Sequence, residues 1–442
     1  MRYRTTTGSS FTEQVYIQSL GHMVVSTLEF RIVAVSSNHN VLTGDSHCNK
    51  LGGRLEDFIS SCFSKSAEEI QGAIYEIANF RSPRKLILHE IDGIHYYINI
   101  YVFEDHLYME WEEQLNRAVQ ASEMNEIGFL FEQNHYDTWG ELCVAIRQLI
   151  DFDRVAILQV LETGKSHMIS ETCSPTVRPL LGERFSETFM PSQALRSYTE
   201  RAYMYTPDIY RDEQKLETIK QVDLAPCLFR RLPDAHRYYM KEIGAAAGLF
   251  FRIIIEGQFW GLVVAHNVLP KKVDLQKRKL CSFIVQTAAS KEEGHSKRRL
   301  LQYQSKIEDI EQGLKTNLLE SKTLHSGLVR NIKQLSQLLH ADGVILYLHG
   351  DVSSYGVEIA DSQIEKIVSL FKEQPKRPLW KDCNFREKHG EKISDKLPFA
   401  GLLVLQLDDD EEHFIVWLRE ETLTSELQFD KVSRQANDVP NE

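Results

Sequence analysis

The stretch from Leu275 to Ser321 constrains the fold more than any other part of the sequence. It contains no proline, and its apolar residues Ile307, Ile310, Leu314 and Leu318 recur every three to four positions among charged ones. This spacing predicts one long amphipathic helix. We interpret it as a helix that links domains and pairs its apolar seam with the same helix of a second copy. The alternative is that the seam packs on the helix's own domain.

Shorter elements lie on both sides of this helix. Before it, the sequence predicts strands at residues 23–28, 30–35, 86–89, 96–102, 155–160, 246–255 and 259–264, and helices at 55–63, 67–78, 111–130 and 139–150. After it, we expect helices ending at 339 and spanning 363–373, and strands at 344–348, 401–407 and 414–418. Asp92-Gly93 and Glu256-Gly257 are typical of hairpin turns, which indicates antiparallel pairing. The long segment 180–240 is typical of a functional or disordered loop.

The length and charge of the chain limit its class. Because 442 residues exceed what one hydrophobic core supports, we expect several domains. The net charge of −12 argues against nucleic acid or an anionic membrane as a partner, since both select basic surfaces. No apolar run approaches the roughly 20 residues of a membrane span, and residues 1–12 lack the apolar stretch of a signal peptide. We therefore expect a cytoplasmic protein.

The seven cysteines are dispersed, and no two form a C-x-x-C pair. An odd, dispersed set without an export signal indicates free thiols in a reducing compartment. We interpret them as small buried apolar residues. No cluster of zinc ligands is visible, so we expect no bound metal.

A series of short segments identifies the architecture. In the middle region they are F-D-R-V at 152–155, L-G-E-R-F at 181–185, P-S-Q-A-L-R-S-Y at 191–198, H-R-Y-Y-M-K-E-I-G at 236–244 and F-W-G-L-V-V-A-H at 259–266. The flanks contribute I-Q-S-L-G at 17–21, V-S-S-N at 35–38, A-D-G-V at 341–344, A-G-L-L at 400–403 and W-L-R at 417–419. In order and spacing, these segments resemble the PAS, GAF and PHY domains of phytochromes and bacteriophytochromes.

The resemblance implies three tandem domains, which are PAS at 1–115, GAF with a bilin-type pocket at 118–295, and PHY at 296–442. The third is expected to be incomplete at its C-terminal end, because the polar residues 422–442 lack apolar positions that could close a domain. The implied fold class is α/β, with α+β sensor domains that are each an antiparallel sheet flanked by helices, joined by the long helix. In the family, the N-terminal segment threads a GAF loop, which would hold PAS and GAF together as one rigid body.

The resemblance also assigns a chromophore pocket. Phytochromes hold a linear tetrapyrrole, and His236 and His266 stand where the family places its two pocket histidines. Tyr198 matches a tyrosine that contacts a propionate, and Arg230 matches an arginine that binds one, with Arg231 as the alternative by one register step. A guanidinium suits this role because its fork binds a carboxylate bidentately.

Several positions depart from the family pattern. Covalent attachment needs a thiol, but residues 1–16 contain no cysteine, and Ala235 stands where other members have one before the pocket histidine. Cys227 matches neither attachment site. Phe189, followed by Met190, occupies the place of the pocket aspartate, which removes a hydrogen-bond acceptor. Met204 replaces a second propionate-binding arginine, and Gly248 and Phe250 replace small polar residues.

The PHY tongue departs as well. Trp417 and Arg419 match its beginning, but the following Leu423-Thr424-Ser425 replaces a W-G-G-x-P-like turn. The tongue arginine normally pairs with the aspartate that Phe189 replaces, so this switch contact lacks at least its GAF side.

Together these features predict the sensory module of a phytochrome-like receptor that is deficient in normal covalent bilin binding. We expect a homodimer that passes a conformational signal along a helical spine to an output module, a histidine kinase or response regulator beyond this chain. We expect no covalent cofactor, with biliverdin or another bilin bound weakly. The alternative is a working red/far-red photoreceptor that binds biliverdin non-covalently or through an unusual site. No phosphate-binding glycine motif or catalytic constellation is visible, so we expect no enzyme activity from this chain.

Overall fold

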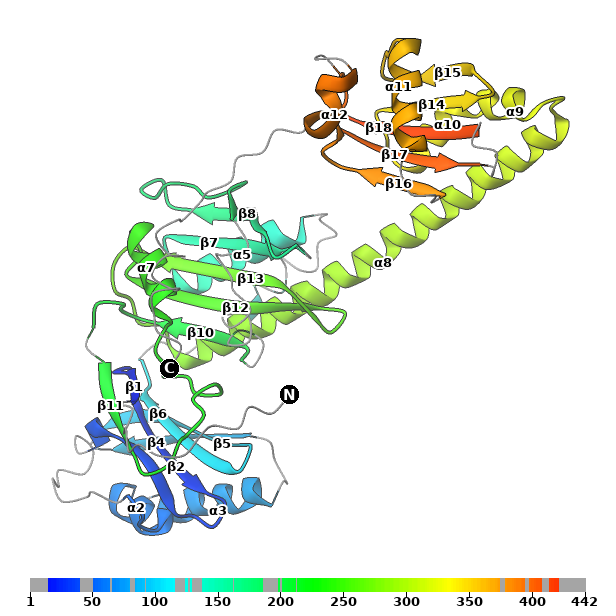
Figure 1. Cartoon of the computed structure of the whole chain (residues 1–442). Coiled ribbons are helices and arrows are strands. Elements are labelled where there is room, and N and C mark those ends of the chain that lie inside the picture. Colours follow the sequence, from blue (N-terminus) through cyan, green and yellow to red (C-terminus); the bar gives the residue numbers. More distant parts are fainter. Residues whose placement is uncertain are drawn as a thin grey trace, which may run out of the picture. The chain divides into compact units, whose positions relative to one another are not determined.

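The computed structural model contains three antiparallel sheets in two compact units, one before residue 294 and one from residue 294 onward (Figure 1). The structure describes residues 15–39, 51–63, 66–79, 84–91, 93–115, 124–125, 128, 137–161, 163–185, 198, 201–211, 213–373, 378–393, 397–407 and 413–420. The predicted fold class of helix-flanked antiparallel sheets with one long helix is confirmed. None of the described helices is long and apolar enough to cross a membrane.

The first sheet has the strand order β1-β11-β3-β2-β6-β5-β4. Its strands are β1 (Val15–Gln18), β2 (His22–Thr27), β3 (Ile32–Ser36), β4 (Arg84–Ile91), β5 (Ile94–Phe103), β6 (His106–Glu113) and β11 (Glu213–Thr218), and the short 3-10 helix η1 (Ser37–His39) follows β3. Helices α2 (Leu55–Cys62) and α3 (Ala67–Ala78) pack on one face around the buried rings of Phe58, Phe63 and Trp111. Apolar side chains at every second strand position build this core.

Strand β11 joins the first two sheets into one unit. It follows β10 of the second sheet in sequence but pairs with β1 and β3 of the first. Next to it, the Nε2 amide of Gln18 donates hydrogen bonds to the carbonyls of Tyr205, at 3.0 Å, and Arg230, at 2.7 Å. The first and second domains therefore share an extensive interface while keeping separate sheets. The threaded N-terminal segment that we predicted lies outside the described residues.

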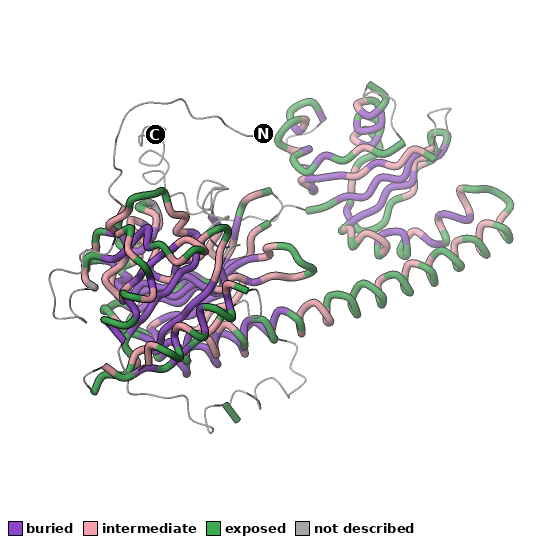
Figure 2. The backbone as a smooth tube through the Cα atoms, turned by 90° about the horizontal axis from the view of Figure 1, so that it is seen from below, coloured by how far each residue is buried: buried purple, intermediate pink, exposed green. Residues whose placement is uncertain are grey.

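The second sheet has the strand order β10-β12-β13-β7-β8-β9. The strands are β7 (Arg154–Val160), β8 (Ser166–Cys173), β9 (Arg184–Phe185), β10 (Tyr203–Thr206), β12 (Ala247–Ile255) and β13 (Gln258–Asn267). Helix α5 (Thr138–Ile150) and the first turns of α8 (Leu275–Glu320) cover one face, and α7 (Asp234–Glu242) lies on the other. The central strands β12, β13 and β7 are buried over most of their length (Figure 2).

A buried polar junction fixes the start of α8 in this unit. Arg278, fully buried, forms an ion pair with Glu112 at the end of β6 and lies 4.5 Å from the ring centre of Tyr205. Asp274 accepts hydrogen bonds from the backbone N–H of Leu115, at 3.0 Å, and from the hydroxyl of Tyr97, at 3.4 Å. A buried charge is tolerated only when it is paired and hydrogen-bonded, so these contacts tie α8 to the first domain.

The third sheet has the strand order β15-β14-β18-β17-β16. Its elements are α9 (Leu324–Arg330), α10 (Ile332–Leu338), β14 (Gly343–Leu348), β15 (Asp351–Tyr355), α11 (Asp361–Lys372), β16 (Leu379–Asp382), α12 (Phe385–Ile393), β17 (Gly401–Gln406) and β18 (His413–Arg419). Helices α11 and α12 pack on one face, and α9, α10 and the end of α8 pack on the other.

Two sequence-based expectations were wrong. Residues 111–113 do not begin a helix but end strand β6, where Trp111 pairs with His22 and Ile98. The segment 180–240 is not a plain loop, because it contains β10, β11 and α7. The other predicted helices and strands are confirmed within a few residues, except that the helix expected to end at 339 is two helices, α9 and α10. Elements β1, β8, β9, β15, β16 and α12 were not predicted.

Candidate functional site

The candidate site lies on the face of the second sheet that α7 covers. Along β12, Leu249 and Phe251 point toward α5 and α8, while Gly248 and Phe250 point toward α7. His266 of β13 pairs directly with Gly248 on one side and with Arg154 of β7 on the other. The strand register therefore brings a glycine, a histidine and an arginine into one row.

His266 is the most deeply buried polar group of this row, with 2% of its surface exposed. Neither ring nitrogen meets a hydrogen-bond partner among the described residues. Burial lowers the pKa of His266 well below its usual value, and the nearby Arg154 guanidinium lowers it further. The ring is therefore a neutral imidazole that offers one donor and one acceptor.

His236 approaches from α7. Its Nδ1 lies 2.6 Å from the hydroxyl of Tyr198, and the two groups share a hydrogen bond. Burial lowers the pKa of His236 to about 4, and its Nε2 has no partner in the described part of the chain. The structure thus brings together three of the predicted site residues, Tyr198, His236 and His266, and all three are uncharged at neutral pH.

Phe250 fills the space between the two histidines. Its ring centre lies 4.5 Å from that of His236 and 5.5 Å from that of His266, with edge-on geometry in both pairs. Gly248 makes this possible, because a β-carbon there would lie 2.7 Å from the Phe250 ring and 2.8 Å from the methyl group of Met240. The glycine and the phenylalanine therefore act as a pair that packs this face.

A buried ion pair supports the other end of the row. Arg154 Nε lies 2.8 Å from Glu171 Oε1, and both side chains are almost fully buried. The second Glu171 oxygen accepts hydrogen bonds from the backbone N–H groups of Leu180 and Leu181, at 2.8 and 2.9 Å. The pair is therefore fully used in holding the segment that follows β8 against the sheet.

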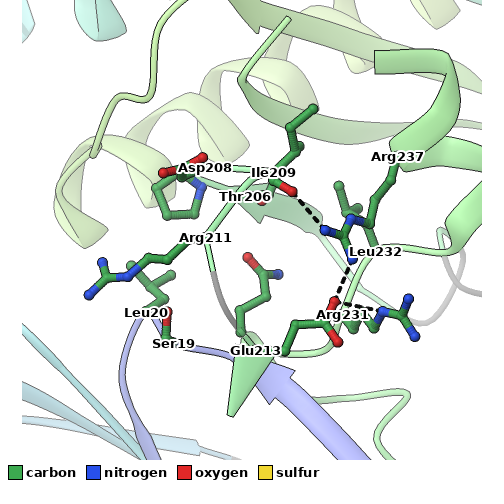
Figure 3. Close-up of a pocket in the computed structure, with 12 residues that line it drawn as sticks. Ser19, Leu20, Thr206, Asp208, Ile209, Arg211, Glu213, Arg231, Leu232 and Arg237 are labelled. Carbon is green, nitrogen blue, oxygen red and sulfur yellow. Dashed lines mark hydrogen bonds and ion pairs between the residues drawn. The ribbon is translucent and has the colours of Figure 1, made fainter. Parts of the chain in front are cut away.

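The arginines of this region are not equivalent. Arg231 and Arg237 both form ion pairs with Glu213, beside a cavity of about 30 Å³ that is large enough for one water molecule (Figure 3). Arg230 pairs with no carboxylate among the described residues, and its backbone bridges to Ile17 of β1. Of the two registers considered for the propionate arginine, Arg230 is the one that keeps its charge available.

The remaining pocket predictions divide into two groups. Met204 is buried opposite Phe250 on the neighbouring strand, so an apolar side chain extends the packed cluster. Cys227 is fully buried at the interface with the first sheet, and burial raises the pKa of its thiol well above the usual value, which disfavours the reactive thiolate. Phe189 and Met190 lie outside the described residues.

The predicted tongue residues are engaged within the third domain. Trp417 donates its indole N–H to the carbonyl of Leu335, at 2.8 Å, and Arg419 donates to the carbonyl of Leu339, at 3.0 Å. Both line a cavity of about 750 Å³ beside β16, β17 and β18, which the sequence did not reveal. In the described part of the chain, no three histidine, cysteine or acidic side chains cluster as a metal site.

The apolar seam of α8 has a partner in its own domain. Leu314 and Leu318 pack on the cluster formed by α9, α10 and the third sheet. The hydroxyl of Tyr303 also donates to the Leu338 carbonyl. These contacts favour packing of the C-terminal part of the seam on its own domain, the alternative considered for this helix. Pairing with a second copy stays a prediction.

Comparisons with known proteins agree with the resemblance. The family described as phytochrome region, PHY, matches residues 307–425. The chain is phytochrome-like. Over 427 residues it is 21% identical to cyanobacterial phytochrome A of Nostoc, a match that covers 91% of this chain and 54% of that protein. It is also 21% identical over 298 residues to the phytochrome-like protein Cph1 of Synechocystis, covering 66% and 40% of the two chains.

A solved structure extends the likeness to the fold. The phytochrome-like chain matches the crystal structure of the bacteriophytochrome RpBphP3 from R. palustris with a TM-score of 0.75 and 19% identity, covering 92% of this chain and 85% of that one. It spans about half or less of the length of the curated relatives it matches. These likenesses concern the sequence and the fold, and they do not depend on the side chains around His236 and His266.

Sequence reasoning missed the parts of the site that depend on side-chain packing. It noted Gly248 and Phe250 as departures, but not that the ring occupies the space between the histidines. It also missed Tyr239, whose ring centre lies 6.0 Å from that of His266, and the Arg154–Glu171 pair. The alternation of β12 was the available signal, since it places residues 248 and 250 on the face opposite Phe251.

Proposed function

We propose that this chain is the sensory module of a phytochrome-like receptor whose second domain forms no covalent bilin adduct and binds bilins weakly. The supporting observation is the Phe250 ring between His236 and His266. A flat tetrapyrrole that contacts both imidazoles needs the volume that this ring occupies. Ala235 and the buried Cys227 offer no accessible thiol near the site.

Signal transfer is proposed to run through α8. The helix starts on the Glu112–Arg278 junction, where it contacts both the first and the second domain, and it extends to the third domain's elements. A change of packing around β12 or β10 would reach α8 through Cys281, Ile284 and Val285, which pack on that sheet. We propose a homodimeric arrangement and a kinase or response-regulator output beyond this chain, without enzyme activity in residues 1–442.

The second candidate is a photoreceptor that holds biliverdin without a covalent bond. It is favoured by the three imidazole nitrogens without partners on His236 and His266 and by the unpaired charge of Arg230, among the described residues. A bilin would use such groups for its pyrrole nitrogens and one propionate. Residues that serve only packing have no need to retain these polar atoms.

An absorption spectrum separates the two candidates. The protein is co-expressed with a bilin-producing haem oxygenase, purified, and examined before and after red illumination, followed by zinc fluorescence on a denaturing gel. We expect no zinc fluorescence and little red absorbance. A red band that photoconverts reversibly without zinc fluorescence would favour the second candidate, and strong zinc fluorescence would refute the proposed lack of an adduct.

A further inference from the structure

A third cavity, of about 210 Å³, lies between the first and second sheets and is unrelated to the histidine cluster. Its walls come from the start of β4, the end of β5, the segment that enters β10, and the loop before Arg230. Arg84, Tyr101 and Arg201 contribute its polar surface, and Val102, Phe103 and Leu228 contribute its apolar surface. One guanidinium thus reaches the cavity from each domain.

Arg201 is held in place by its own domain. It is 8% exposed, its Nη2 donates to the carbonyl of Leu224 at 2.7 Å, and its Nε donates to the carbonyl of Ala225. No described residue accepts a hydrogen bond from Nη1. Because the other two nitrogens are fixed on carbonyls and the side chain lines the cavity, Nη1 is positioned for an acceptor that enters it.

Arg84, an exposed residue, also lines this cavity. Its guanidinium carbon lies 4.4 Å from the ring centre of Tyr101, and this stacking fixes the plane of the fork. Tyr101 is itself held by a hydrogen bond from its hydroxyl to the carbonyl of Pro226, at 3.2 Å. Two arginines with restricted orientation that line one cavity are a typical arrangement for binding an oxyanion.

A buried acid, Glu110, interacts electrostatically with both cavity arginines. It accepts hydrogen bonds from the backbone of Leu228, at 2.7 Å, and from Asn99, at 3.3 Å. Burial raises the pKa of Glu110, which disfavours its negative form. The pKa of Lys279 is lowered by burial and then by Arg84 and Arg278, as expected for a lysine among other cations.

We propose that this cavity binds a small oxyanion between Arg84 and Arg201, and that its apolar wall favours a carboxylate on a short apolar body. A bound carboxylate would accept from both guanidinium groups and bridge the first and second domains. Such a ligand stabilises the folded unit by mass action. The site is independent of any bilin, so it can exist whether or not the proposed function holds.

The test uses the purified 442-residue protein and four probes, which are benzoate, acetate, inorganic phosphate and the neutral isostere benzamide. Binding is followed by titration calorimetry and by the shift in melting temperature at constant ionic strength. We expect saturable binding of benzoate, weaker binding of acetate, and none of benzamide. Saturable phosphate binding that exceeds benzoate binding would keep the oxyanion site and overturn the preference for a carboxylate.

Variants place the binding at the cavity. Arg84→Gln and Arg201→Lys are each expected to weaken benzoate binding about 10-fold or more, the usual effect of losing a charged hydrogen bond. Arg31→Gln, which changes an exposed arginine of the same domain, is the matched control and should bind as the unaltered protein does. Equal binding of benzamide and benzoate, unchanged affinity in both cavity variants, or no saturable signal from any oxyanion would each overturn the proposal.

Discussion

The second and third sheets are built on the same plan but are covered differently. The order β10-β12-β13-β7-β8 of the second corresponds to β16-β17-β18-β14-β15 of the third. In the second sheet Tyr203 pairs with Phe251, and in the third Leu379 occupies the corresponding place opposite Leu405. Tyr203 is 8% exposed in the cluster beneath α8, whereas its counterpart Leu379 is 50% exposed.

The difference arises in the helices that cover the two sheets. After β13 the chain forms α8, whose Cys281, Ile284 and Val285 cover the β10–β12 half of the second sheet. The described residues provide no such helix for the β16–β17 half of the third sheet, and the 750 Å³ cavity lies there. In the described part of this chain, the large cavity therefore opens where no helix covers the sheet. The face of the second sheet on which the family resemblance places a pocket is instead packed by Phe250.

The largest expected contrast concerns corresponding core positions. Phe251→Ala removes a fully covered ring and should destabilise its sheet by about 3–5 kcal/mol, whereas Leu405→Ala on the half-covered sheet should cost about 1–2 kcal/mol. Hydrogen exchange of the β12 and β17 amides measures each cost separately. Equal costs would mean that the third sheet is covered as well as the second.

Acid should weaken the second domain through its histidines. In the folded state the pKa of His236 is lowered to about 4, and the pKa of His266 is also lowered. Because both imidazoles regain their usual pKa on unfolding, the unfolded chain binds more protons below about pH 6.5. The free energy of unfolding therefore keeps its full value above this pH. It declines as the pH falls toward 4, by about 1.4 kcal/mol per pH unit for each histidine. Urea unfolding of the protein between pH 7.5 and 4.5 measures this slope.

The control for the acid effect is His266→Phe, which keeps an aromatic ring in the cluster and removes one titrating group. In this variant, the slope of the free energy of unfolding against pH should correspond to the uptake of about one proton fewer. Arg154 is the charged group that faces His266 across the neighbouring strand, and we expect its ion pair with Glu171 to remain in this variant. An unchanged slope would show that other groups cause the acid lability.

The smallest effect is expected at the exposed edge of the third sheet. Leu379→Gln should change stability by about 0.5 kcal/mol or less, because half of the side chain is already in water. The matched change Tyr203→Gln, at the corresponding buried position beneath α8, should cost several times more. A comparable loss in both variants, measured by hydrogen exchange, would indicate that an element covers Leu379 in solution.

The sequence predicted elements well where apolar residues repeat at regular spacing. The prediction failed at β6, where Glu110 and Glu112 are buried. The backbone N–H of Leu228 donates to Glu110 and Arg278 forms an ion pair with Glu112, so a buried strand carries the polar residues of an exposed helix. It failed at β11, whose polar residues pair with the sheet of another domain. Local patterns cannot reveal partners that are distant in sequence.

For the site, sequence motifs identified Tyr198, His236 and His266 as neighbours in space. They could not show that Phe250 lies between the histidines, because ring placement depends on the absent side chain of Gly248 and on Met240 of another element. Nor could they locate the 750 Å³ or 210 Å³ cavities, which depend on how elements cover one another.

The central claim is that the Phe250 ring prevents tight bilin binding. It is tested most directly by titrating biliverdin into three proteins, which are the unaltered chain, Phe250→Ser and Phe251→Ser. The two variants lose adjacent buried rings from opposite faces of β12, and only the first opens space between His236 and His266. We predict weak binding to the unaltered protein, at least about 10-fold tighter binding to Phe250→Ser, and no gain for Phe251→Ser. Tight, stoichiometric binding by the unaltered protein with reversible red/far-red conversion, or equal gains in both variants, would contradict the account.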